Sequence, residues 1–406
     1  MTSITFQRSP LIEVNFNAHK WFSILFTVLW KITIQSVRQR GMLLLQLILP
    51  ILTLTCFCFC VGRVPFDVPL AVVNEESPPD LSAIYLRNID SHILKIQNYS
   101  DLQSARDAVL KSKAWAVLHI RANFSDSLIQ RFDNIDETDD ELIKAGQMTI
   151  HADLTNDVLS ITLKRALDEA FKGFAVEVLE LLEYNPKLLE LPIQAYPIHG
   201  SLKKSNFFEL QSFVIPGLLV ILTYTFGFSG TMLLTMSEKN DKIYDRNVVG
   251  GVTSTHIVVG HLISRFMFMS FTSILLVFIA LVFFNTPAKG SVFWAIILLF
   301  LQTIAGLTNG MMISSLCANI HMAVIVSNGV LLFIFIISGV LWSVESLPYW
   351  LRWFSYITPT TLPTQSLRSI LARGLGISDL IVFEGFFVSI AYAIFFASIS
   401  VFFFPH

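Results

Sequence analysis

Charge is scarce in this sequence. Asp, Glu, Lys and Arg make up 14% of its 406 residues, whereas soluble globular chains carry about 25%. Hydrophobic residues make up 53%, and several apolar runs approach the roughly 20 residues that cross a bilayer as a helix. These proportions exclude a wholly soluble protein and predict an integral membrane protein.

A phosphate-binding loop is also absent. The sequence contains no G-x-x-x-x-G-K-[ST] motif and no other glycine-rich cradle for phosphates. We therefore do not expect these residues to hydrolyse ATP, or to act as an enzyme, by themselves. The net charge of −2 averages regions of unlike composition, and nothing in the sequence predicts a nucleic-acid partner.

Cysteine is rare, with four residues in the chain. None lies in the polar block 63–212, so no disulfide framework holds that block together. Cys56, Cys58 and Cys60 share the first apolar run, but on a helix they point in three directions. We expect lipid-facing or core thiols there rather than a metal site. His256 and His261 do not share a helical face either, so we predict no metal site in the chain.

Long apolar runs are abundant, and six of them predict transmembrane helices. They are residues 42–61, 213–236, 266–284, 292–316, 322–342 and 380–404. The third helix is expected to begin near Thr255. Before the first span (segment 42–62), residues 20–40 carry basic residues, Trp21, Trp30 and apolar residues at helical spacing. This pattern predicts an interfacial helix within the N-terminal segment 1–41.

The large polar block, residues 63–212, alternates strand-like and helical patterns, which predicts a small α/β domain. The strands are expected at 70–74 and 114–120, and the helices at 80–89, 102–111 and 156–184. Two N-glycosylation acceptors, Asn98 and Asn123, lie in this block. Their confinement to it favours a position outside the cytosol.

The distribution of basic residues predicts the orientation. Five of them precede the first span, and only Arg63 follows it closely. The five are Arg8, Lys20, Lys31, Arg38 and Arg40. The N-terminus is therefore predicted to be cytosolic, and six spans place the C-terminus on the same side. The block 63–212 is then extracellular, and the charged loop 237–254 between the second and third spans is cytosolic.

The loop 343–379 is too long for a simple hairpin. It contains an amphipathic aromatic segment at 348–354, a proline-broken stretch at 358–363 and a second helical segment from Ser366 to Arg373. Apolar segments that are too short to span are typical of re-entrant elements. The predicted fold is thus an α-helical membrane protein with six transmembrane helices, an N-terminal interfacial helix, a re-entrant last external loop and an extracellular α/β domain.

Motifs in the segment 213–406 resemble the membrane domain of type-2 ABC transporters. Phe213 to Gly217 is similar to the family's F-x-x-P-G signature, and residues 238–253 resemble the segment that contacts the ATPase. The last external loop agrees in order and spacing at Pro348, Arg352, Pro359, Ser366 and Arg368. Within subfamilies A, G and H, the chain most resembles the arthropod H-type, or G-like, half-transporters. It departs from the pattern at Lys242, where Gly is usual, and at His256, where Glu is usual.

The resemblance implies a membrane subunit of an ATP-driven exporter that moves lipid or other hydrophobic cargo outward across the plasma membrane. It implies a homo- or heterodimer with another membrane half. It also implies a partner ATPase that holds ATP and Mg²⁺, with no cofactor in this chain. Contact with the ATPase would involve Glu238, Lys239, Asp245, Arg246, Gly250 and Gly251. The cargo path would pass Tyr224, Phe226, Phe228, Asn309, Phe333 and Phe335.

Other interpretations stay open at this point. The missing phosphate loop fits either a truncated product or a separate subunit that recruits its ATPase. A non-transporting, receptor-like or regulatory subunit is a function of a different class, and an ATP-independent permease is another. The charged loop 237–254 discriminates between them, because a transporter needs a contact surface there and a regulatory protein does not.

Overall fold

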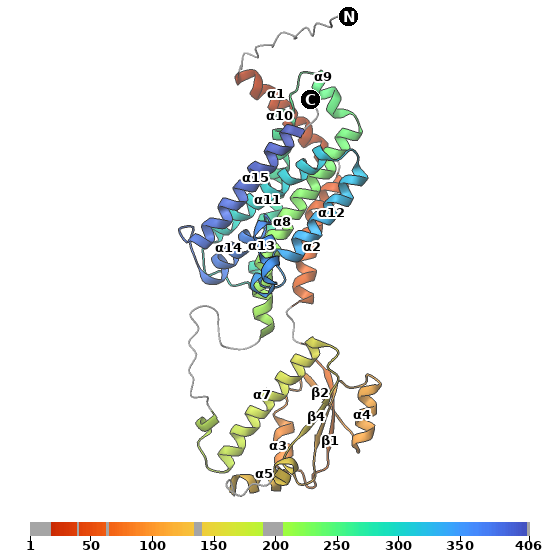
Figure 1. Ribbon diagram of the computed structural model, residues 1–406, viewed down its shortest axis with the longest axis vertical. Helices are drawn as coiled ribbons and strands as arrows, with labels where there is room; N and C mark the ends of the chain where they lie inside the picture. The colour runs from red at the N-terminus through yellow and green to blue at the C-terminus, as the bar shows by residue number, and fades with distance from the viewer. Residues whose placement is uncertain (1–17, 39, 62–64, 134–139, 190–205, 404–406) are drawn as a thin grey trace, which may run out of the picture. The chain divides into compact units, whose positions relative to one another are not determined.

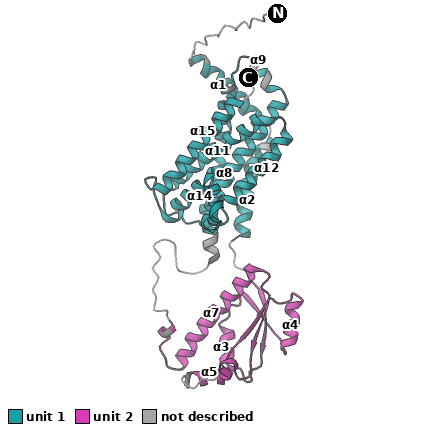
Figure 2. Cartoon of the chain, in the orientation of Figure 1, with its two compact units in different colours: residues 1–62, 197–406 teal, residues 63–196 magenta. Residues whose placement is uncertain are grey.

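The computed structural model describes residues 18–38, 40–61, 65–133, 140–189 and 206–403. The chain divides into two compact units (Figure 2). The helical unit comprises Met1–Gly62 and Pro197–His406, and the α/β unit comprises Arg63–Tyr196. The predicted polar block extends to residue 212, whereas the described residues from Asn206 onward belong to helix α8 (Asn206–Asn240) of the helical unit.

Six helices of the helical unit are long and apolar enough to cross a membrane, which confirms the six predicted spans within the described residues. They are α2 (Arg40–Cys60), α8 (Asn206–Asn240), α10 (Ser254–Val282), α11 (Val292–Leu316), α12 (Ile320–Ile337) and α15 (Leu380–Phe403). Helix α10 begins at Ser254, next to the predicted start. Helix α12 ends before the predicted residue 342, because Gly339 adopts a positive φ of 72° that does not continue a helix.

An amphipathic helix, α1 (Ala18–Arg38), precedes these spans, as predicted. It packs on α10, with Val28 and Ile32 buried and Trp30 exposed. Gly260 of α10 permits this close contact, since a Cβ atom there would lie 2.9 Å from Val28 Cγ1. Its position at the membrane surface stays a prediction.

Two glycines set the central crossing of the helical unit, between α8 and α11. A Cβ atom at Gly306 would lie 2.2 Å from the Tyr224 carbonyl oxygen, and one at Gly310 would lie 2.2 Å from that of Phe228. Only glycine fits at either position. The G-x-x-x-G spacing, which brings membrane helices into close contact, is here used within one chain.

The segment after α12 folds back against the spans. It contains η3 (Val344–Ser346), α13 (Tyr349–Ile357), α14 (Thr361–Arg368) and the π-helix η4 (Ser369–Arg373). Helix α14 contacts α8 and α15, and most of its residues are buried. Within the helical unit, α13 and α14 lie at the end opposite to α1 and α9 (Figure 1). The two helical segments predicted in 343–379 are therefore present, and whether they enter the membrane stays a prediction.

The α/β unit is a four-stranded sheet in the order β2-β1-β3-β4, with β4 antiparallel to β3 and the other pairs parallel. Helices α3 and α7 cover one face and α4 covers the other (Figure 1). The predicted elements correspond to β1 (Val68–Asn74), α3 (Leu81–Arg87), α4 (Leu102–Leu110), β3 (Ala116–Ile120) and α7 (Asp157–Leu181). Five further elements were not predicted from the sequence: β2 (Leu94–Asn98), α5 (Phe124–Asp133), α6 (Asp140–Ala145), β4 (Thr149–Ala152) and the short η2 (Pro186–Leu189).

Glu76 fastens the loop between β1 and α3. Its buried carboxylate accepts hydrogen bonds from the backbone amides of Asp80 at 3.1 Å, Ser82 at 3.3 Å and Ser125 at 3.0 Å. Burial by itself raises the pKa of Glu76, but the hydrogen bonds from Ser125, Ser82 and Asp80 outweigh it. The pKa therefore lies below its ordinary value of 4.5.

We expect Glu76→Gln to lower the free energy of unfolding of the α/β unit at pH 7 by about 1.5–3 kcal/mol, because charge-assisted hydrogen bonds are lost. A carboxyl whose pKa is depressed on folding stabilises the fold above its unfolded pKa. That stabilisation is lost as the pH falls through the folded pKa. The difference from wild type should therefore narrow below pH 4.5. Thermal unfolding at pH 7 and at acidic pH measures it, with exposed Glu141→Gln as the control. A difference that does not change with pH would contradict this explanation.

Candidate functional site

The charged segment between the second and third spans is mostly helical. Helix α8 continues to Asn240, and a short helix, α9 (Ile243–Val249), precedes α10. Lys242 and Gly251, with φ of 54° and 85°, flank α9 and turn the chain at each end. The predicted loop 237–254 is thus two helical segments joined by tight turns, because its charged residues continue the helical pattern of the span before them.

Glu238, in the last turns of α8, is inside the protein. Its side chain is 5% exposed, and its Oε2 accepts a hydrogen bond from His261 Nε2 of α10 at 2.9 Å. The His261 side chain is fully buried. This pair ties α8 to α10 at the end where α9 connects them. A carboxylate is costly to bury without such a partner.

Further polar contacts extend this pair to three other helices. Arg265, one turn after His261, donates from Nη1 to Gln46 Oε1 of α2 at 2.9 Å. Lys31 of α1 donates from Nζ to Asn247 Oδ1 of α9 at 3.0 Å. These side chains join α1, α2, α8, α9 and α10, and we call them the polar cluster: Lys31, Gln46, Glu238, Asn247, His261 and Arg265.

The polar cluster retains unused hydrogen-bonding capacity. Glu238 Oε1, His261 Nδ1 and Arg265 Nε are buried and have no partner among the described residues. An unpaired buried polar atom costs about 1–3 kcal/mol. The observed packing of α8 on α10 therefore leaves buried polar atoms unsatisfied at this contact.

Beside the polar cluster, His256 anchors the start of α10 to α1. Its ring lies 5.0 Å from the Trp21 ring, centroid to centroid. Its Nδ1 is 2.6 Å from Thr253 Oγ1, which joins it to the turn that follows α9. Trp21, expected at the membrane surface, therefore also contacts α10.

The outer surface of this region is formed by α9 and its flanking turns. Lys242, Arg246, Gly250 and Gly251 are exposed, and Val249 is 90% exposed. An exposed apolar side chain among basic residues and accessible backbone can contact another protein.

Glu238 and Lys239, two of the residues predicted to contact the ATPase, make contacts with other helices of this chain. Glu238 is buried in the polar cluster, and Lys239 donates from Nζ to the Cys317 carbonyl at 2.9 Å. Both hold helices together within the chain. The side chain of Asp245 lies outside the described residues.

The aromatic residues predicted beside a cargo path do not form one surface. Tyr224 and Phe228 are fully buried at the crossing of α8 and α11, where Asn309 Nδ2 donates a hydrogen bond to the Tyr224 hydroxyl. Phe226 and Phe335 are half-buried. Phe333 of α12 is 53% exposed, so it is the one of these aromatic side chains that is largely free to meet another molecule.

Arg368 fastens the last loop at the other end of α8. Its guanidinium donates to the carbonyl oxygens of Phe213 at 2.8 Å, Gly339 at 2.8 Å and Val340 at 3.0 Å. The Arg368 Cζ lies 3.6 Å from the centroid of the Phe213 ring. Gly217 leaves room for it, since a Cβ atom there would lie 3.2 Å from Arg368 Nη2.

The other residues predicted in this loop also make backbone contacts. Arg352 donates from Nε to the Leu347 carbonyl at 2.9 Å, and Ser366 donates to the Ile381 carbonyl at 2.6 Å. The Pro359 carbonyl accepts from Gln302 Nε2 of α11 at 3.2 Å. Pro348 forms the N-cap of α13. These contacts close the loop onto α11 and α15.

Residues 40–403 match the family described as "ABC-2 family transporter protein". The chain belongs to this ABC-2 transporter family. It is 26% identical over 373 residues to "ABC transporter G family member 20" and 24% identical over 376 residues to "ABC transporter G family member 23", both from Dictyostelium discoideum. These matches cover 91% and 92% of the chain but only 49% and 51% of the relatives. The chain therefore spans about half of their length.

A bacterial relative has a more similar length. The chain is 23% identical over 366 residues to "Probable multidrug ABC transporter permease YbhR" from Escherichia coli, and this match covers 87% of the chain and 90% of the relative. The sequence-based resemblance to a type-2 ABC transporter membrane domain with G-family likeness is thus confirmed. The 406 residues of this ABC-2 chain contain no phosphate loop.

Several residues of the polar cluster and of the α8 and α11 crossing were missed in the sequence. His261 and Arg265 are one helical turn apart, just before the apolar run that begins at Phe266. Polar residues at i and i+4 in a spanning helix indicate one face that avoids lipid. From this spacing, the polar face of α10 could have been predicted to contact Glu238. The Gly306-x-x-x-Gly310 spacing could have identified the α8 and α11 crossing.

Proposed function

We propose that this chain is the membrane-spanning part of an ATP-driven exporter, coupled to an ATPase that lies outside these residues and holds ATP and Mg²⁺. The ATPase docks on α9 and its flanking turns. The observation that carries the proposal is the polar cluster. In it, Asn247 of the exposed α9 bonds to Lys31 of α1, beside the hydrogen bonds that join α8 to α10 and α10 to α2. Movement of α9 is transmitted through the Lys31 and Asn247 hydrogen bond to α1, and through the chain to α8 and α10.

The cargo that this site supports best is a lipid or another hydrophobic molecule. Apolar side chains on α12 leave the chain largely uncovered, and Ile325, Leu332 and Phe333 are 73%, 61% and 53% exposed. Such a surface suits hydrocarbon or a second membrane half. We therefore propose a homo- or heterodimer in the plasma membrane, with the cargo path next to α12.

Reversing one exposed charge tests the docking surface. We expect Arg246→Glu to weaken ATPase binding to the full chain about tenfold, because a rim charge governs complementarity with a partner. Purification of the tagged chain from the cells that make it, followed by vanadate-sensitive ATP hydrolysis, measures the bound ATPase. Exposed Lys289→Glu lies between α10 and α11 at the opposite end and should have no effect. Equal ATPase activity with all three proteins would place ATPase docking away from α9 and overturn this docking surface. No activity with any of them would support a regulatory subunit or an ATP-independent permease instead.

The orientation of the chain is tested by its two glycosylation acceptors. We propose that the α/β unit is extracellular and that both termini are cytosolic. Asn98 and Asn123 are exposed, so both are accessible to a glycosyltransferase. We expect glycosidase treatment to shift the electrophoretic mobility of the wild type, to shift each single Asn→Gln variant less, and to leave the double variant unchanged. Protection of α9 from external protease serves as the control. Unmodified acceptors that react with cytosolic reagents would reverse the orientation.

A further inference from the structure

A long groove runs along the free edge of the sheet in the α/β unit. Strand β4 is an edge strand that pairs only with β3. The groove has a cavity volume of about 1060 Å³ and is lined by α4, β4 and α7, which is at the upper end of the range for ligand pockets. Five consecutive residues, from Ile150 to Leu154, form its base.

The backbone of β4 presents unpaired groups to this groove. The Asp153 amide donates to the Trp115 carbonyl at 2.9 Å. In an antiparallel ladder, bonded pairs alternate with unbonded ones. The amides and carbonyls of Thr149 and His151 therefore point to β3, whereas those of Ile150 and Ala152 point out into the groove. Among the described residues, the backbone amides and carbonyls of Ile150 and Ala152 have no hydrogen-bond partner.

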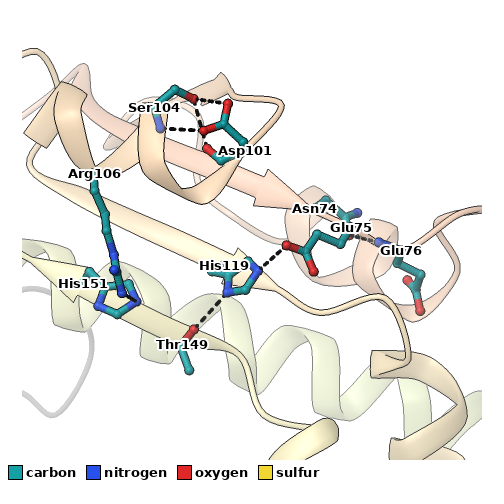
Figure 3. Close-up of polar contacts among 9 residues, drawn as sticks. All are labelled: Asn74, Glu75, Glu76, Asp101, Ser104, Arg106, His119, Thr149 and His151. Carbon is teal, nitrogen blue, oxygen red and sulfur yellow. Dashed lines mark hydrogen bonds and ion pairs between the residues drawn. The ribbon is translucent and has the colours of Figure 1, made fainter.

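The two sides of the groove differ in character. On the α7 side, Leu163 and Leu167 form an apolar wall, next to Ile150, which is 48% exposed. On the α4 side, Arg106 reaches over to His151 of β4 and donates from Nη2 to its Nε2 at 3.1 Å (Figure 3). An arginine can only donate, so His151 accepts and is neutral.

The α4 side therefore carries a guanidinium, that of Arg106, whose hydrogen bond goes to a neutral group. Desolvation lowers the pKa of His151, and the charge of Arg106 lowers it further. No salt bridge joins Arg106 to any described acid. Asp153 shares this side of the strand, where its Oδ1 accepts from the Thr155 amide and hydroxyl. Lys164 and Asp168 of α7 add one charge of each sign to the lining. A carboxylate from outside would complement Arg106.

We propose that this groove binds an extended segment of another polypeptide as a fifth strand of the sheet, with apolar side chains facing α7 and an acidic side chain facing Arg106. Strand addition pairs the open groups of Ile150 and Ala152, and side-chain pockets then select the sequence. A hydrocarbon chain in the groove would leave these groups unpaired. A second copy of β4 would place two Arg106 side chains near each other. The inference does not depend on the transport proposal.

Fluorescence polarisation with the full chain in detergent tests it. The probe is a labelled eight-residue peptide that alternates Val and Glu, compared with one that alternates Val and Lys. We expect the Glu peptide to bind at least tenfold more tightly, and Arg106→Glu to reverse that preference. Lys95→Glu, an exposed charge on the opposite edge strand β2, should leave it unchanged. No binding of the Glu peptide up to about 1 mM, the weak limit of specific association, overturns the proposal.

Hydrogen exchange tests the pairing of the peptide backbone with β4 separately from its charge preference. Hydrogen exchange should become slower at the Ile150 and Ala152 amides when the peptide binds, whereas the His151 amide is already protected. Ala152→Pro removes one outward donor, which an edge strand tolerates, and should weaken binding at least tenfold without changing the protection of β3. Binding that ignores Ala152→Pro and is displaced by oleate indicates a lipid pocket and overturns the proposal. Dimers that Ala152→Pro dissociates, without protection by peptide, indicate a second copy and also overturn it.

Discussion

We expect Glu238→Ala to uncouple the chain from the proposed ATPase partner and to lower its free energy of unfolding by about 3–5 kcal/mol, the cost of breaking a buried pair by removing one partner. The loss arises because His261 is fully buried and Glu238 is its hydrogen-bond partner. In the variant, His261 and Arg265 share a buried space with no anion from α8. Helices α8 and α10 then lose the hydrogen bond that joins them at this end.

A second set of variants separates stability from coupling. Replacing both Glu238 and His261 with Leu removes both members of the hydrogen bond, so the double variant should recover part of the lost stability, while Arg265 keeps its bond to Gln46. It should still fail to couple, since it has no polar contact to exchange. Exposed Glu180→Ala in α7 is the control. Thermal unfolding in detergent and vanadate-sensitive transport in vesicles measure the two effects. Wild-type transport by Glu238→Ala would remove the polar cluster from the mechanism.

Gly306→Val will prevent the helical unit from assembling. Even a single added Cβ atom would lie 2.2 Å from the Tyr224 carbonyl oxygen, and a backbone atom in the middle of α8 cannot move aside as a side chain can. Overpacking ordinarily costs about 1–3 kcal/mol, and we expect more than about 3 kcal/mol here because α11 must separate from α8 along its length.

The control for this variant is Gly329→Val in α12, where a Cβ atom would meet nothing within 4 Å. Both glycines lie in apolar spanning helices, so the two variants differ mainly in what surrounds them. The yield of monodisperse protein and its melting temperature distinguish them. If both variants fold equally well, the close crossing of α8 and α11 is not required for assembly.

The spans were predictable because each needs about 20 apolar residues whatever surrounds it. The buried strands β1 and β3 were predictable for a similar reason, since LAVVN and AWAVLHI are apolar and β-forming. Strand β2 was missed because LKIQN, at one edge of the sheet, exposes Lys95 and Ile96 and shows no buried face. Strand β4 has four residues and is held by its register with β3, which no local pattern reveals.

The candidate site was less predictable than the fold. A dense run of charges from Glu238 to Arg246 has the composition of a solvated loop, yet the helix of the preceding span continues into it. Whether Glu238 is inside or outside depends on His261, which is 23 residues away on another helix. Composition locates such a segment, but only the packing of α8 on α10 determines which of its charges are available to a partner.

Helix α8 is held by hydrogen bonds near both of its ends and is crossed closely by α11 near its middle. Its 35 residues make a rod of about 52 Å at about 1.5 Å per residue. Arg368 hydrogen-bonds to Phe213 near one end of α8, and His261 hydrogen-bonds to Glu238 near the other end. About midway between these two contacts, the glycines of α11 pack on Tyr224 and Phe228. Each of the two end contacts lies about 20 Å from this crossing along the helix. A tilt of α8 by about 5° about the crossing would therefore move each contact by about 1.7 Å, in opposite directions. A small displacement of one end of α8 would therefore move the other end by a similar distance in the opposite direction.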